Sequence, residues 1–184
     1  MKKILPSLVV ALIILASCGK DQDPYVIDQT RVGPITQQTQ IRELDSLFAG
    51  DSIVRAVNPG QFSGNRNEIQ IFDSQGNRLL LVEPVQAFDS TSTIGFIQVM
   101  DARYTTSKGL GPQSSFKDIV ENYNISRIEN TLRAAVVFID ELNLYITIDK
   151  QELPPELRYD TQSRILASQI PDNARFKYFM INWD

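Results

Sequence analysis

Histidine is absent from this chain of 184 residues, and cysteine occurs once, at Cys18. Sites that pair a serine or cysteine nucleophile with a histidine base are therefore excluded, as are zinc and haem sites built on histidine or on several cysteines. Basic residues are also in the minority, with 18 Lys and Arg against 22 Asp and Glu. This balance argues against nucleic acid as a partner and against electrostatic attraction to anionic lipid. We expect neither a metal nor a cofactor.

The chain also lacks a hydrophobic run long enough to cross a bilayer. Residues 4–15 are apolar and follow Lys2 and Lys3, but a spanning helix needs about 20 such residues. A short positive segment followed by a short apolar segment is typical of a secretory signal peptide. Residues 15–18 then read Leu-Ala-Ser-Cys, with Gly19 after them. An ordinary signal-peptidase site would instead end in small residues without this cysteine.

These four residues resemble a bacterial lipobox. The resemblance implies that Cys18 takes a thioether-linked diacylglycerol, that residues 1–17 are removed as a lipoprotein signal peptide, and that the new amine is acylated. A lipidated cysteine is no longer a thiol, and several acyl chains together anchor a protein stably. A plain signal peptide with an incidental cysteine, or an uncleaved signal anchor, are the alternatives.

A polar stretch follows the cysteine, and we expect residues 18–31 to form a flexible tether. Gly19 stands where enterobacterial lipoproteins retained in the inner membrane carry Asp. Residues 20–23, Lys-Asp-Gln-Asp, are similar to the signal that sends some Bacteroidota lipoproteins to the cell surface. A solvated spacer is the alternative interpretation. We therefore expect a protein anchored by lipid in the outer membrane, on its periplasmic or surface face.

Two stretches about 75 residues apart have the same pattern. Residues 36–48 and 111–123 each place apolar side chains at helical spacing, with Thr39 and Ser114 as expected N-caps. A predicted hairpin follows each helix, over residues 68–83 and 134–149, and then a third strand. Those third strands are expected over residues 93–100 and 175–183.

The predicted fold is therefore α+β, with two similar α-β-β-β halves in a domain of residues 32–184. Repeats over 32–104 and 105–184 would form an antiparallel sheet with helices packed on one face. Chance similarity of two amphipathic helices is the alternative. The layout resembles tandem-repeat, β-lactamase-inhibitor-like envelope lipoproteins. Residues 104–111, Tyr-Thr-Thr-Ser-Lys-Gly-Leu-Gly, are similar to a pattern in small uncharacterised Bacteroidota lipoproteins, a family that implies no catalytic residues.

Few residues in this chain are candidates for chemistry. Lys108, beside Gly109 and Gly111, could assist an anion at the start of the following helix, although a tight turn explains the same residues. Strand-end carboxylates are candidates for acid–base work or for capping turns; they are Asp73, Asp140 and Asp149. Ser114 and Lys117 match S-x-x-K, the nucleophile motif of penicillin-binding proteins, but the partner motifs S-D-N and K-T-G are missing.

A polar loop over residues 60–67 is the strongest candidate for recognition. Phe62 and Arg66 within it are residue types that anchor interfaces, and an ordinary surface loop is the alternative. We expect a non-enzymatic binding module whose partners are the membrane, through its lipid, and an envelope protein. A small hydrolase that uses carboxylates, or a purely structural lipoprotein, are the alternatives. An exposed aromatic patch around Phe62 or the last strand would favour the binding module.

Overall fold

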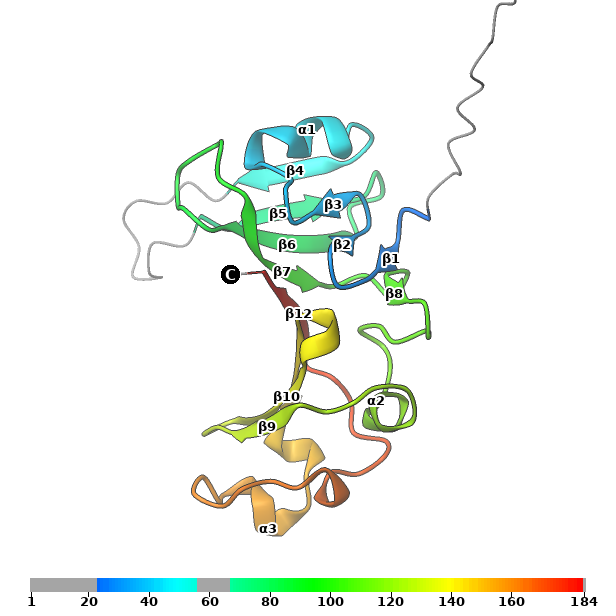
Figure 1. Ribbon diagram of the computed structural model, residues 1–184, viewed down its shortest axis with the longest axis vertical. Coiled ribbons are helices and arrows are strands. Elements are labelled where there is room, and N and C mark those ends of the chain that lie inside the picture. Colours follow the sequence, from blue (N-terminus) through cyan, green and yellow to red (C-terminus); the bar gives the residue numbers. More distant parts are fainter. Residues whose placement is uncertain (1–22, 56–66, 184) are drawn as a thin grey trace, which may run out of the picture.

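The computed structural model describes residues 23–55 and 67–183, and most of its strands belong to one antiparallel sheet of eight strands. Figure 1 shows these strands stacked along the long axis of the molecule, from β4 to β9. In spatial order the strands are β4 (Ser52–Arg55), β5 (Ile69–Phe72), β6 (Arg78–Pro84), β7 (Ile94–Val99), β12 (Tyr178–Asn182), β11 (Leu144–Asp149), β10 (Ala134–Ile139) and β9 (Arg127–Asn130).

A second, smaller sheet and several short helices complete the fold. The small sheet has the order β3 (Ile35–Thr36), β2 (Arg31–Val32), β1 (Val26–Ile27) and β8 (Thr105–Thr106), with β1 and β8 parallel. The α-helices are α1 (Leu44–Leu47), α2 (Phe116–Asn122) and α3 (Pro155–Arg158). The 3-10 turns are η1 (Ile41–Glu43), η2 (Asp140–Leu142), η3 (Lys150–Glu152) and η4 (Ala167–Gln169). The fold is thus α+β and rich in sheet, as predicted.

One face of the large sheet forms the core. Alternate residues of its strands are buried there, because successive side chains of a strand point to opposite faces. Phe179 and Ile181 of β12 are 1% and 0% exposed, and they share one cluster with Leu44 of α1 and with Phe116 and Ile119 of α2. The small sheet adds its apolar residues to the same cluster, and Figure 1 shows β8 and α2 on the same side of β12.

The first helix begins one residue later than predicted. Gln40, not Thr39, is the N-cap. The backbone amide of Gln40 donates a hydrogen bond of 2.7 Å to the Glu43 carboxylate. Thr39 is buried, and its Oγ1 accepts from the amide of Thr36. The hydroxyl of Thr39 therefore closes the turn before the helix, and the ordered helical segment is shorter than residues 36–48.

The second helix departs from the prediction in the same way. Ser115, rather than Ser114, is the N-cap of α2. The backbone amide of Ser115 donates a hydrogen bond of 2.7 Å to the Asp118 carboxylate. These hydrogen bonds from Ser115 lower the pKa of Asp118. Ser114 Oγ accepts from the amide of Gly111, three residues earlier. In both helices the predicted cap residue braces the turn that leads into the helix.

Each of these two helices is followed by four strands of the large sheet, one more than predicted. The additional strands, β4 and β9, are the edges of the large sheet. Both have only four residues and each carries an arginine, and short length and charge are common in edge strands. The two hairpins, β5–β6 and β10–β11, lie where predicted, and β7 matches residues 93–100. The last strand is shorter than residues 175–183, because Arg175, Phe176 and Lys177 approach the sheet without joining it as strand.

The folded domain begins before residue 32. The predicted tether of residues 18–31 overlaps β1 and β2, where Ile27 is 1% exposed. The backbone carbonyl of Gln29 accepts hydrogen bonds of 3.2 Å from Asn143 Nδ2 and from Trp183 Nε1. Burial of Ile27 and these long-range hydrogen bonds hold residues 26–31 against the large sheet, so this part of the chain is not a tether.

Candidate functional site

The face of the large sheet opposite the core carries an unbroken row of outward side chains. Strand pairing places one residue from each strand in register across all eight strands. In spatial order they are Val54, Gln70, Leu81, Gln98, Met180, Tyr145, Phe138 and Arg127. Seven of the eight are half-buried or exposed apolar, aromatic or amide side chains, and Arg127 ends the row. We call this row and its outward neighbour Phe96 the outer face.

Aromatic rings are concentrated in one half of the outer face. Phe138 and Tyr145 stack with their ring centroids 5.8 Å apart and their planes at 20°, and Phe96 lies 6.4 Å from Tyr145. The guanidinium carbon of Arg127 lies 3.5 Å from the centroid of Phe138. Cross-strand aromatic pairs contribute about 0.5–1.5 kcal/mol beyond the area they bury. The rings therefore support one another and present their edges outwards.

A shallow depression of about 460 Å³ adjoins this row of rings. Its lining residues are Arg127, Phe138, Asp140, Asn143, Leu144, Tyr145 and Asn182. Arg127 is held by Glu129 at 3.0 Å and lies 3.9 Å from Asp140. Asn143 has a left-handed backbone, with φ of 52°, and its amide is fixed on Gln29. The depression thus combines aromatic edges with a cation, a carboxylate and two amides.

The chemistry of the outer face suits recognition. A one-sided antiparallel sheet ordinarily has a polar solvent face, whereas here Phe96, Phe138 and Tyr145 lie outwards. Tyr, Phe, Met and Arg are the residue types enriched in protein interfaces. Among residues 23–55 and 67–183, no group of three or more carboxylates could hold a metal ion.

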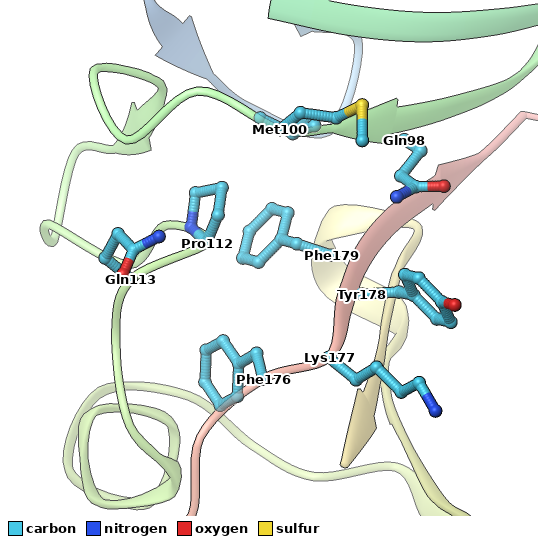
Figure 2. Close-up of a pocket in the computed structure, with 9 residues that line it drawn as sticks. Gln98, Met100, Pro112, Gln113, Phe176, Lys177, Tyr178 and Phe179 are labelled. Atoms are coloured by element: carbon cyan, nitrogen blue, oxygen red, sulfur yellow. The ribbon is translucent and has the colours of Figure 1, made fainter. Parts of the chain in front are cut away.

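A second cavity lies where β7 ends and β12 begins. Its volume is about 150 Å³, which is room for one small ring. Figure 2 shows Pro112, Phe176 and Phe179 turned towards the same space, while Tyr178 and Lys177 point away. The charge of Lys177 is committed to Asp149, with Nζ 2.8 Å from the carboxylate. This cavity is a small space lined by both polar and apolar residues, and its one lysine is already paired.

Two of the strand-end carboxylates, Asp73 and Asp149, have environments opposite to those of a general acid. Hydrogen bonds from the side chain and backbone of Asn77 lower the pKa of Asp73. The hydrogen bond from Lys177 lowers the pKa of Asp149. A catalytic acid would need a raised pKa. Asp73 and Asp149 are therefore ionised at neutral pH, and both cap turns.

The S-x-x-K residues are also engaged elsewhere. The hydroxyl of Ser114 accepts from Gly111, and Lys117 extends to Glu121 at 3.5 Å on the exposed side of α2. Lys117 thus pairs along its own helix.

Lys108 lies at the opposite end of α2 from the predicted anion site. Its Nζ donates to the carbonyl of Asn122 at 2.6 Å and lies 4.5 Å from the ring centroid of Tyr123. A lysine there satisfies the last carbonyls of the helix and the negative end of its dipole. Gly109, with φ of 80°, lies in the tight turn that precedes α2 in the chain. Lys108 therefore stabilises the helix end and does not fit an anion site at the helix start.

The remaining predicted site residues lie outside the described part of the chain. They are Cys18, Phe62 and Arg66. The aromatic residues of the outer face were missed, although the sequence held a signal for them. Residues 134–139 are apolar at every position, which in a one-sided sheet places apolar groups on the solvent face as well. In residues 23–55 and 67–183, no helix is long and apolar enough to cross a membrane.

The described residues form a sheet-rich α+β fold with a row of aromatic side chains on its outer face. Comparison with known proteins adds one structural likeness. The chain is similar to the crystal structure of the uncharacterized protein YfeY from Escherichia coli, with a TM-score of 0.51 and 13% sequence identity. The match covers 85% of this chain and 98% of YfeY, and at this identity it shows the fold alone. No protein-family model matches the sequence, and a search of curated proteins finds no match.

Proposed function

We propose that this protein is a lipid-anchored lipoprotein of the outer membrane and a non-enzymatic binding module for another envelope protein. The outer face carries this proposal, because its aromatic row is already stacked before a partner arrives. Because these side chains are already ordered, they lose little conformational entropy when a partner covers them, and this lowers the free-energy cost of binding. The lipobox-like residues 15–18 supply the anchor, and the acidic body leaves attachment to the acyl chains.

We also infer that the domain arose from two similar halves, each a helix followed by four strands of the large sheet. Equivalent backbone amides at the two helix starts donate to equivalent carbonyls before the last strand of each half. The matching pairs are Ile41 to Ser92 (3.0 Å), Phe116 to Ala174 (3.0 Å), Arg42 to Ser90 (2.9 Å) and Lys117 to Asp172 (2.9 Å). The strand order supports the same inference, because each half contributes four neighbouring strands and the halves meet at β7 and β12.

Replacing Cys18 with alanine is expected to abolish lipid attachment. The variant lacks the sulfur that would carry the diacylglycerol, so the chain should remain an unacylated, full-length precursor. Mass spectrometry of the N-terminal peptide and flotation of membranes would measure this. Replacing Ser17 with alanine is the matched control, because a small residue before the cysteine is retained. Normal acylation and flotation of the Cys18→Ala chain would refute the anchor.

The binding role is tested by photo-crosslinking from the outer face. A photoreactive residue at Tyr145, in the otherwise native protein in intact cells, is expected to form one dominant protein adduct. The same residue at Lys117, on the exposed side of α2, is the control and should form none. Replacing Phe138 with serine removes the ring that stacks on residue 145. This change should weaken the adduct from position 145 by at least tenfold, which corresponds to about 1.4 kcal/mol of binding free energy. Equal adducts from Tyr145 and Lys117 would contradict recognition by the outer face.

A further inference from the structure

The N-terminal segment is fixed to the domain at Tyr25. Its ring packs edge-on against buried Tyr104, with centroids 5.1 Å apart, and its hydroxyl accepts a 2.8 Å hydrogen bond from Arg103. The guanidinium carbon of Arg103 lies 4.7 Å from the centroid of the Tyr25 ring. From Tyr25 onwards, the chain therefore moves with the domain.

Arg103 extends this fixed point to the turn between β5 and β6. It forms ion pairs with Asp101 at 2.9 Å and with Asp73 at 3.0 Å. Asp73 in turn accepts from the backbone amides of Gln75 and Asn77. Tyr25 and the exposed tip of the β5–β6 turn, residues 74–77, thus form one rigid surface. We call it the anchor end.

The chain between Cys18 and the anchor end is short. Tyr25 follows Cys18 by seven residues, and seven fully extended residues reach about 25 Å at most. A compact domain of this size has a radius of gyration of about 15 Å, so its diameter exceeds that reach. A lipid at Cys18 cannot let the domain turn over and present its far end to the bilayer.

We propose that the anchor end faces the phospholipid headgroups of the membrane that holds Cys18, and that the end bearing α3 and η4 points away from it. Figure 1 shows α3 at the bottom of the molecule, far from β1. The proposal rests on lipidation of Cys18. The charged groups at the anchor end are Asp51, Asp73, Asp101 and Arg103, which are acidic overall. The short tether, and not attraction to anionic headgroups, sets this orientation.

Two single-cysteine variants of the lipidated protein test the orientation. Ser74→Cys places a thiol on the anchor end, and Ser168→Cys places one on η4; both serines are exposed. Lipidated Cys18 is a thioether, so a thiol-reactive fluorophore labels only the new cysteine. The proteins are reconstituted in vesicles of phosphatidylethanolamine with a minor fraction of phosphatidylglycerol, with nitroxide on some headgroups. We expect the label at residue 74 to be quenched severalfold more strongly than the label at residue 168.

Several outcomes separate the orientation from the anchor itself. Equal quenching of both labels on acylated, vesicle-bound protein would overturn the orientation and leave the anchor intact. Absence of acyl mass and of vesicle binding would instead overturn the lipoprotein proposal. A flexible Gly/Ser insertion before Asp23 is the second test, and it should bring the two labels to similar quenching. Persistence of the full difference with the longer tether would overturn the argument from reach.

Discussion

Replacing Phe179 with alanine is expected to lower the free energy of unfolding by about 3–5 kcal/mol, the usual range for a buried phenylalanine. Phe179 is 1% exposed. It pairs with Val99 of β7 on one side and with Ile146 of β11 on the other. The truncation would also enlarge the 150 Å³ gap that its ring lines. Urea unfolding followed by far-ultraviolet circular dichroism would measure the loss.

The neighbouring residue provides the control for this experiment. Tyr178 belongs to the same strand but is 42% exposed and points away from the cavity (Figure 2). Tyr178→Ala is expected to cost less than about 1 kcal/mol, as surface substitutions commonly do. If Phe179→Ala lowered the free energy of unfolding by less than about 1 kcal/mol, the Phe179 ring would not contribute to the packing of β12 between β7 and β11.

Replacing Gly33 with alanine is expected to destabilise the domain by more than about 2 kcal/mol. Gly33 has φ of 57°, and an added Cβ would lie 2.5 Å from the Pro24 carbonyl oxygen and 2.9 Å from Tyr104 Cε1. The left-handed backbone alone costs alanine about 1–2 kcal/mol. The clash adds to this, because the rigid backbone of Pro24 and the buried ring of Tyr104 leave little room. Thermal unfolding of the two proteins would give the difference.

Gly76 separates backbone strain from the clash. It also has a positive φ, 84°, but nothing lies within 4 Å of the Cβ position. Gly76→Ala should therefore cost only the backbone strain, about 1–2 kcal/mol. Equal losses for the alanine variants of Gly33 and Gly76 would contradict the close approach of Pro24 and Tyr104 to Gly33.

Hydrophobic periodicity predicted the centre of this fold well and its edges poorly. The β10–β11 hairpin was recognisable because residues 134–139 are all apolar and residues 144–148 are rich in β-forming side chains. β4 and β9 were not, since a four-residue edge strand such as β9 (Arg127–Asn130) is held by pairing with its neighbour and not by its own pattern. The helix starts were misplaced by one residue. Thr39 is the residue type that caps helices, but the turn before the helix takes its hydroxyl, and the amide of Gln40 donates to Glu43 instead.

Residues 134–139 indicated that apolar side chains face the solvent, but which aromatic rings meet on the outer face could not be predicted. Phe96, Tyr145 and Phe138 are far apart in the chain, and their approach depends on the order of β7, β12, β11 and β10 in the sheet. The sequence shows that each aromatic residue is present, but it does not show the order of the strands that brings the rings together. Lys108 shows the same limit, because its contact with Asn122 depends on how the preceding turn folds back on α2.

The place of β12 has a consequence for the order of folding. It is the last strand in the described chain, yet it lies between β7 and β11 at the centre of the large sheet. Until residues 178–182 arrive, β7 lacks its inner neighbour and the strands before and after it cannot merge into one sheet. Pairings between such distant segments form late in folding. The two groups of four strands therefore become one continuous sheet only when the final strand is in place, so that the last described strand completes the whole domain.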